Sequence, residues 1–333
     1  LTKDGKSVTL STYINGTLNA QGGKIQFTDD GEYVLTATMT DALGRSYSCS
    51  DSITVYPIPE IELTLPQTGY AGESAVASVS GTVLDNLTAV WTISKDSGEA
   101  APYSDFASGE LAKDGGSIAF LAKGSYTLTV TMTDALGRTF ADSAAITVYP
   151  IPKIELTLLQ TGYAGESASV AISGTDLDNL TTAWTISKDG GTAKNYTDYT
   201  SGTLAADGGS IAFGSKGSYT LTVTMTDALG RSFADSAAIM VYPIPDIALS
   251  LPQTGYVGEA ATVSVSGTDL DNLTAVWTIS KDGGTAKTYT EYTSGTLAAD
   301  GGNITFSDKG SYTLTVTMTD ALDRTFSESS AIT

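Results

Sequence analysis

Apolar and polar residues alternate with a period of two along much of this chain. The clearest run spans residues 219–226, Tyr-Thr-Leu-Thr-Val-Thr-Met-Thr, which puts its large apolar side chains on one face and its threonines on the other. Such alternation predicts a β-strand with one buried face. No stretch has the 3.6-residue period of an amphipathic helix, so the pattern predicts an all-β protein.

Shorter runs of the same kind predict the neighbouring strands. They lie at 154–158, 169–173, 182–187, 210–213 and 231–241, with a weaker one at 199–204. Together with 219–226 these make about seven strands, and seven strands without helices predict a two-sheet β-sandwich of the immunoglobulin size.

The same patterns return at a fixed period. The pentapeptide Asp-Ala-Leu-Gly-Arg begins at Asp41, Asp134 and Asp227, a variant of it begins at Asp320, and each step is 93 residues. A period of this length fits one sandwich domain per repeat. The expected domains are an incomplete C-terminal part at 1–56, full repeats at 57–149 and 150–242, and a nearly full one at 243–333. We expect both ends of the chain to be cuts in a longer array.

Glycines and prolines fall where turns and connectors need them. In Asp-Ala-Leu-Gly-Arg, Gly230 is expected to take the left-handed conformation of a short hairpin loop. Asp323 replaces this glycine in the last copy, and Asp is among the few other residues that tolerate that conformation. The Asp-Gly-Gly runs at 189–191 and 207–209 predict further turns.

The connector between copies is Tyr-Pro-Ile-Pro, which starts at Tyr56, Tyr149 and Tyr242. Its prolines fix φ and extend the residues before them. We therefore expect short, stiff joints and an extended rod of tandem sandwiches.

Three features of each copy resemble a known family. They are a tryptophan on a predicted strand (Trp91, Trp184, Trp277), a Gly-x-Tyr that opens a Thr/Val strand (124–126, 217–219, 310–312, and 31–33 in the first copy), and the Thr-Asp-Ala-Leu-Gly hairpin. On these features the copies resemble bacterial immunoglobulin-like modules of the PKD type. In other sandwiches such a tyrosine makes the corner before a strand. The resemblance implies buried tryptophans and a role as spacers or adhesive units of surface proteins, or as accessory domains of secreted hydrolases.

Charge narrows the possible partners. The chain has 37 acidic and 17 basic residues and a formal net charge of −20. Nucleic acids and anionic membrane surfaces are bound by clustered Lys and Arg, which this sequence lacks, so neither is an expected partner. The apolar runs are also too short for membrane insertion of this segment.

The residue inventory argues against an enzyme. There is no histidine and a single cysteine, so Ser-His-Asp and Cys-His catalytic sites and His/Cys zinc sites cannot be built. Cys49 stands where the other copies have Asp142, Asp235 and Glu328, so we expect it to face solvent, with an intermolecular disulfide as the alternative. We predict no catalytic and no cofactor-binding residues.

Calcium is the candidate cofactor. Hard oxygen ligands cluster in one loop of two copies, at Asp176, Asp178, Asn179, Asp269, Asp271 and Asn272. The second copy has Val83 in place of the first Asp. An Asx-rich turn without metal is the competing interpretation.

Two further motifs suggest binding. Leu-Pro-Gln-Thr-Gly at 65–69 and 251–255 matches a sortase signal, but another module follows the first copy, so we interpret it as a strand that ends in a turn. Tyrosine pairs at Tyr196, Tyr199, Tyr289 and Tyr292 are candidates for a glycan- or protein-binding patch, with core packing as the alternative. Isopeptide cross-links are not expected, because the recurrent lysines lie at turn edges.

The leading hypothesis is a structural stalk of an extracellular bacterial protein, secreted or held on the cell surface, in which neighbouring repeats are each other's partners. Direct multivalent adhesion to a glycan or host protein is a second hypothesis. A third is an accessory role in a secreted polysaccharide-degrading enzyme. The fourth is assembly with other copies into a filament or surface layer, through strand edges left open in the incomplete first copy.

Overall fold

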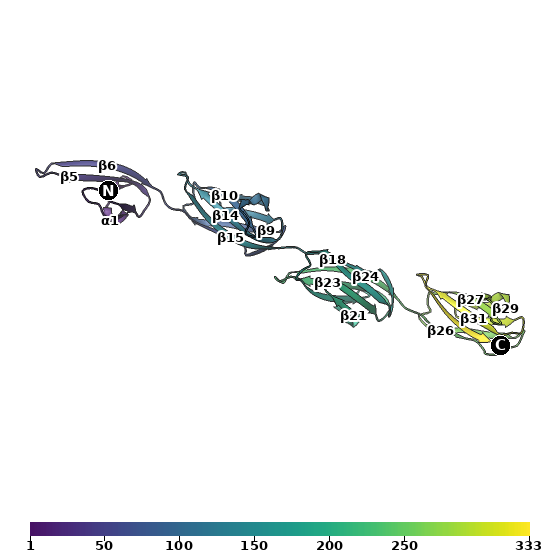
Figure 1. Cartoon of the computed structure of the whole chain (residues 1–333). Coiled ribbons are helices and arrows are strands. Elements are labelled where there is room, and N and C mark those ends of the chain that lie inside the picture. The colour runs from purple at the N-terminus through teal and green to yellow at the C-terminus, as the bar shows by residue number, and fades with distance from the viewer. The chain divides into compact units, whose positions relative to one another are not determined.

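The structure is a computed structural model that describes residues 1–333 (Figure 1). The chain forms two compact units, Leu1–Ile151 and Pro152–Thr333, and each unit holds two of the repeats. Strands dominate every repeat, as the alternation predicts. The helices are a single turn, α1 (Leu10–Tyr13), and three-residue 3₁₀ turns, all too short to leave a helical period in the sequence.

The second repeat is a sandwich of two sheets. One sheet has the order β12-β13-β9-β7 and consists of β12 (Ala107–Ala112), β13 (Gly115–Phe120), β9 (Ser74–Thr82) and β7 (Glu60–Thr64). The other has the order β11-β10-β14-β15-β8 and consists of β11 (Ala101–Pro102), β10 (Thr88–Lys95), β14 (Gly124–Thr133), β15 (Thr139–Tyr149) and β8 (Thr68–Tyr70).

The third repeat, in the second unit, has the same two sheets. The four-stranded sheet contains β16 (Lys153–Leu158), β18 (Ser167–Thr175), β22 (Gly208–Phe213) and β21 (Thr200–Ala205). The five-stranded sheet contains β17 (Thr161–Tyr163), β24 (Ser232–Tyr242), β23 (Gly217–Thr226), β19 (Thr181–Lys188) and β20 (Lys194–Asn195). All seven predicted strands of this repeat are present, and the short strands β17 and β20 are additional.

The fourth repeat has two four-stranded sheets. The first contains β25 (Asp246–Ser250), β26 (Ala260–Thr268), β30 (Gly301–Phe306) and β29 (Thr293–Ala298). The second contains β28 (Lys287–Thr288), β27 (Thr274–Lys281), β31 (Tyr312–Thr319) and β32 (Thr325–Ile332). The 3₁₀ turns of the three sandwiches are Tyr103–Asp105, Tyr196–Asp198 and Tyr289–Glu291.

The first strand of the second and third repeats crosses from one sheet to the other. In the third repeat, β16 pairs with β18, and after Leu159-Gln160 the chain continues as β17, which runs parallel to the last strand, β24. The parallel pairing is closed by backbone bonds from Met240 to Gln160 (2.9 Å) and from Ala164 to Tyr242 (2.8 Å). The first strand thus holds both sheets together.

Each sandwich encloses its own hydrophobic core, and the three cores lie within residues 63–148, 168–241 and 251–332. The apolar face of residues 219–226 is buried, as its alternation predicts. Trp184 is 8% exposed, and its indole N–H donates to the carbonyl of Ala205 (3.1 Å). The equivalent bonds of Trp91 and Trp277 are 3.0 Å long.

The Gly-x-Tyr tyrosine makes a corner in every repeat. Tyr219 is fully buried, and its hydroxyl donates to the backbone carbonyl of Ser215, four residues earlier (2.8 Å). Tyr33, Tyr126 and Tyr312 make the same bond at 2.8 to 2.9 Å. In front of the ring, Gly217 leaves room for the chain of Lys188, because a Cβ there would lie 2.6 Å from its Cε.

The Asp-Ala-Leu-Gly-Arg hairpin is closed by its first side chain. Asp134 Oδ1 accepts from the backbone N–H groups of Leu136 and Arg138, both at 2.9 Å. Gly230 has φ +81°, and Asp323 takes the same left-handed conformation at φ +63°. Both predictions for this loop are confirmed.

The incomplete first repeat contains only part of this architecture. Its main sheet has the order β2-β1-β5-β6, from β2 (Lys6–Ser7), β1 (Thr2–Lys3), β5 (Gly31–Thr40) and β6 (Ser46–Val55), and β3 (Ile14–Gly16) pairs with β4 (Ile25–Phe27). Met39 on β5 is 57% exposed, whereas its counterpart Met132 is fully buried. The difference arises because no counterparts of β7 and β9 cover this face.

Candidate functional site

The six predicted calcium ligands lie on tight turns. Asp176, Asn179, Asp269 and Asn272 all have left-handed backbones, with φ between +57° and +62°. In the fourth repeat, Asp269 forms an ion pair with Lys216. No three His, Cys, Asp or Glu side chains gather closely enough to hold a metal ion. Turn geometry and a lysine partner therefore account for these residues, and the calcium site, which includes Asp178 and Asp271, stays a prediction.

The tyrosine pairs point into their own repeats. Tyr196 and Tyr199 are partly buried against the core of the third repeat, and the Tyr196 hydroxyl accepts from the Leu204 N–H (3.3 Å). The ring of Tyr199 packs edge-on against Tyr219, with centroids 6.0 Å apart. Tyr289 and Tyr292 pack in the same way in the fourth repeat. Packing accounts for their positions, and a ligand-binding patch stays a prediction.

The sortase-like motif and Cys49 have structural explanations. Residues 65–67 form the crossover of the first strand between sheets, and Thr68-Gly69 opens β8, so the motif is a strand transition rather than a simple turn. Cys49 is exposed, as predicted. Its counterpart Asp142 is partly buried, and its carboxylate accepts from the N–H of Leu63 on β7 (2.7 Å), a strand that the first repeat lacks.

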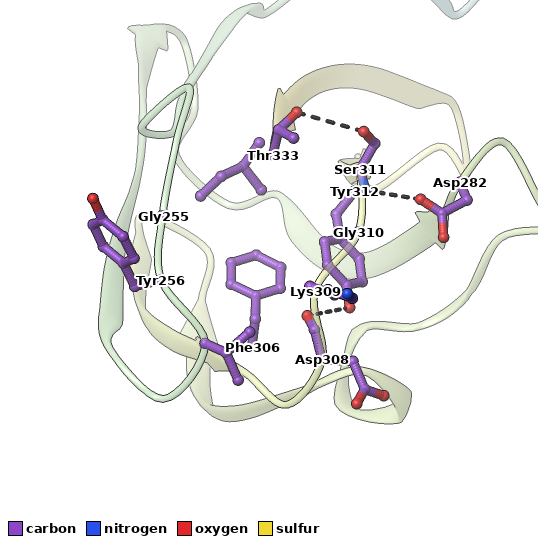
Figure 2. A pocket seen from close by; sticks show the side chains of 12 residues that line it. Gly255, Tyr256, Asp282, Phe306, Asp308, Lys309, Gly310, Ser311, Tyr312 and Thr333 are labelled. Carbon is purple, nitrogen blue, oxygen red and sulfur yellow. Dashed lines mark hydrogen bonds between the residues drawn. The ribbon is translucent and has the colours of Figure 1, made fainter.

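One hollow of about 480 Å³ lies at the end of the fourth repeat (Figure 2). Phe306, Tyr312, Ile332 and Thr333 line it, and Tyr256 lies at its margin. In the third repeat the residues that follow the counterparts of Ile332 and Thr333 are Val241, 2% exposed, and Tyr242. The hollow therefore corresponds to the place of two strand residues and carries no catalytic constellation.

The richest polar cluster lies in the second unit, where the third and fourth repeats meet. Tyr163, at the end of β17, donates its hydroxyl to Asp320 Oδ2 (2.6 Å). The guanidinium of Arg324 lies 4.4 Å from the centroid of the Tyr163 ring, and its Nη1 is 2.7 Å from Glu166 Oε1. We call these four residues the joint cluster.

A second ion pair, between Lys216 and Asp269, joins the same two repeats. Both residues line a hollow of about 450 Å³ with the connector prolines Pro243 and Pro245. Asp271, Asn272 and Asp320 also face this hollow, and the Lys216 ammonium supplies a positive charge beside these carboxylates. The side-chain hydrogen bond to Asp269 raises the pKa of Lys216.

The joint cluster shifts the ionisation of its members. Burial, and after it the hydrogen bond to Asp320, raises the pKa of Tyr163 to about 12. Burial alone would raise the pKa of Asp320, but hydrogen bonds from Tyr163 and from two backbone N–H groups outweigh it, so this pKa lies below its ordinary value. At neutral pH the cluster therefore holds a neutral phenol donor against an ionised carboxylate.

The sequence analysis did not identify the joint cluster. Its available signal was the recurrence of Thr-Gly-Tyr-x-Gly-Glu at 161–166 and 254–259, directly after the first strand, where no turn type requires a tyrosine or a glutamate. The structure also contains no helix that is long and apolar enough to cross a membrane.

Comparisons with known proteins give the fold. No protein-family model matches this sequence, and no curated protein matches it. Among solved structures, the I-band fragment I67–I69 of titin is similar, with 15% identity over 84% of this chain and 99% of its own, and a TM-score of 0.51. The insect immune protein hemolin matches with 15% identity over 99% of this chain and 90% of its own (TM-score 0.36), and immunoglobulin domains 1–5 of Sidekick-1 match with 14% identity over 100% and 72% (TM-score 0.33). Of these three, the titin likeness supports the fold: the chain is a tandem array of immunoglobulin-like β-sandwiches.

Proposed function

We propose that the chain is a spacer segment of a large extracellular bacterial surface protein of the adhesin type, in which the number of repeats sets the reach. The observation that carries this proposal is the sameness of the repeats. The tyrosine corner, the tryptophan bond and the hairpin recur with the same partners in each sandwich. Binding sites usually lie on elaborated loops, and no copy has one.

The candidate chemistry of the repeats supports the same role. The tyrosine pairs pack inward, and the hollow at the end of the fourth repeat is a strand position. The absence of histidine from the sequence removes the commonest general base, which favours a non-catalytic protein. A spacer needs what remains: stable modules joined without long linkers.

Small-angle X-ray scattering of the full chain and of a variant that lacks residues 150–242 tests this proposal. The deletion joins Tyr149 to Pro243 and so keeps a Tyr-Pro junction. We expect the maximum dimension to fall by roughly 30–40 Å, the length of one sandwich with strands of 8–10 residues. An unchanged maximum dimension would contradict a spacer.

The same two proteins are then applied to glycan arrays and immobilised extracellular-matrix proteins. No binding is expected. Binding that strengthens with the number of repeats would replace the proposal with multivalent adhesion. Regular fibres of the full chain in electron micrographs would instead favour self-assembly.

A further inference from the structure

The hairpin arginine has two different partners in this molecule. In the first repeat, Arg45 Nε donates to Asp41 Oδ2 within the same hairpin (2.8 Å), and in the second repeat Arg138 Nε donates to Asp134 Oδ2 (2.6 Å). These pairs close the loop on itself. The corresponding tyrosine and glutamate of a preceding repeat do not occur in front of either hairpin, because the first repeat begins beyond that position.

In the fourth repeat, the hairpin has exchanged this partner. Asp320 Oδ1 still accepts from the backbone N–H groups of Leu322 (2.9 Å) and Arg324 (3.0 Å), so the loop itself is unchanged. Its Oδ2, however, accepts from Tyr163 of the third repeat, and Arg324 has turned to the Tyr163 ring and Glu166.

We propose that this exchange is how one repeat recognises the next: the Asp320–Arg324 hairpin is a docking element for the Tyr163–Glu166 turn, and docking fixes the orientation of the third and fourth repeats. For its purpose the inference rests on the proposed spacer function, since a spacer holds its reach only when its joints are stiff. The partner is a second copy of the module itself, here the neighbour in the same chain.

The chemistry of the contact is complementary. The phenol donates to a carboxylate, the guanidinium pairs with a carboxylate, and the same guanidinium lies over the phenol ring, so each charge in the cluster has a partner across the joint. Tyr163 also packs on Tyr242, the first connector residue, with ring centroids 6.2 Å apart. The cluster therefore continues into the Pro-Ile-Pro connector.

The fourth repeat supplies an internal control for Tyr163. Tyr256 occupies the corresponding position, in the same Thr-Gly-Tyr-x-Gly-Glu sequence, and its side chain is 77% exposed. Tyr163 is partly buried in the same local fold, and what covers it is the neighbouring hairpin.

The Lys216–Asp269 pair gives an independent argument for matched joints. The corresponding positions of the first and second repeats hold Asp30 and Val83, so both members of the pair differ together. Val83 has φ +57°, a conformation that disfavours a β-branched residue and suits the Asp of the other copies. A valine there is explained by its partner position, because an Asp would face the carboxylate of Asp30.

Distances between spin labels in the full chain test the docking. Cys49→Ser removes the native thiol, and Thr203→Cys and Thr296→Cys, at matching exposed positions, carry nitroxides in the third and fourth repeats. We expect one narrow distance distribution. Tyr163→Phe with Glu166→Gln should lower the ratio of docked to undocked joints about tenfold, since each change removes a hydrogen bond to a charged group.

The matched control is Tyr256→Phe with Glu259→Gln, the same changes at the exposed counterpart, which should leave the distribution narrow. Circular dichroism of each variant checks that the sandwiches remain folded. A distribution that stays narrow in Tyr163→Phe/Glu166→Gln, or one that is already broad in the parent chain, would overturn the docking proposal.

A second series tests the matched pair. Lys216→Asp places two carboxylates together and should broaden the distribution. Adding Asp269→Val recreates the Asp30 and Val83 combination and should narrow it again. A double variant as broad as Lys216→Asp alone would contradict matching.

These outcomes are separate from those of the spacer test. A chain that binds glycans still has docked joints if the label distances hold. A chain with undocked joints is still a spacer if deletion of a repeat shortens it.

Discussion

At the residue scale, a few polar side chains do the same work in every copy. The tyrosine corner is the clearest, since its hydroxyl satisfies a backbone carbonyl that the turn before the strand would otherwise leave without a partner. A buried carbonyl without a donor costs free energy, whereas the ring alone supplies only packing. This is why the position holds Tyr rather than Phe in all four repeats.

We therefore expect Tyr219→Phe to destabilise the third repeat by about 1–2 kcal/mol. Hydrogen exchange of peptides from this repeat, measured in the full chain at increasing urea, gives the free energy of unfolding. Tyr256→Phe, at an exposed site, should leave the stability unchanged. Equal unfolding midpoints for Tyr219→Phe and the parent chain would show that the hydroxyl contributes nothing.

Sequence reasoning succeeded where one residue determines its own backbone. Gly230 and Asp323 were predicted from the left-handed conformation that the hairpin requires. For Cys49 the prediction of exposure is confirmed, but its premise is incomplete. Its counterpart Asp142 is partly buried by a strand from the other sheet, and a long-range contact of that kind leaves no local pattern.

At the element scale, strands with strict alternation were found and three-residue strands were not. β17 has the sequence Thr-Gly-Tyr, which shows no alternation, and it is held by parallel pairing to β24 nearly eighty residues later. The predicted strands also fell short of the observed ends. Their last residues are Ser, Thr and Gly, which join the ladder through backbone bonds without burying apolar side chains.

Close strand pairing depends on Gly174, where β18 passes β16. A Cβ at this position would lie 1.8 Å from the backbone carbonyl oxygen of Lys153, and its φ is +150°. We expect Gly174→Ala to cost about 3 kcal/mol or more, from steric overlap and backbone strain combined.

Gly165→Ala separates these two causes. Gly165 also has a left-handed backbone, at φ +81°, but a Cβ there meets nothing within 4 Å. Backbone strain alone should cost about 1–2 kcal/mol. The same hydrogen-exchange experiment compares the two variants, and equal losses would mean that the overlap with Lys153 is relieved by a small strand movement.

At the scale of the whole molecule, repeat length and sandwich architecture were predictable, because they follow from periodicity. The joint cluster was not, since Tyr163 and Asp320 are 157 residues apart and their meeting depends on how one sandwich docks on the next. The six Asx residues were noticed because they cluster in sequence, yet the lysine that pairs with one of them comes from the previous repeat.

The joint should respond to alkaline pH. Tyr163 faces Asp320, Arg324 and Glu166, and its pKa is raised from 10.0 to about 12. Because the folded value is the higher one, the contribution of this phenol to docking is complete below pH 10 and is lost as the pH rises through about 12. The phenolate cannot donate to Asp320 and is repelled by it.

Stopped-flow pH jumps with absorbance at 295 nm detect this ionisation before slower unfolding. The difference between the parent chain and Tyr163→Phe should show one tyrosinate with a midpoint near 12. Asp320→Asn should lower that midpoint, because it removes the neighbouring carboxylate. A midpoint near 10 in the parent chain would mean that Tyr163 is not engaged at the joint.

The crossing of the first strand also governs how a repeat carries mechanical load. β17 enters from the N-terminal end of the sandwich and β24 leaves at its C-terminal end, and the two run parallel with paired residues from Thr161↔Met240 to Tyr163↔Tyr242. Tension applied through the two neighbours therefore shears these bonds together rather than peeling them apart one at a time. A bead tied in this way resists a pull along the strands far better than a pull across them.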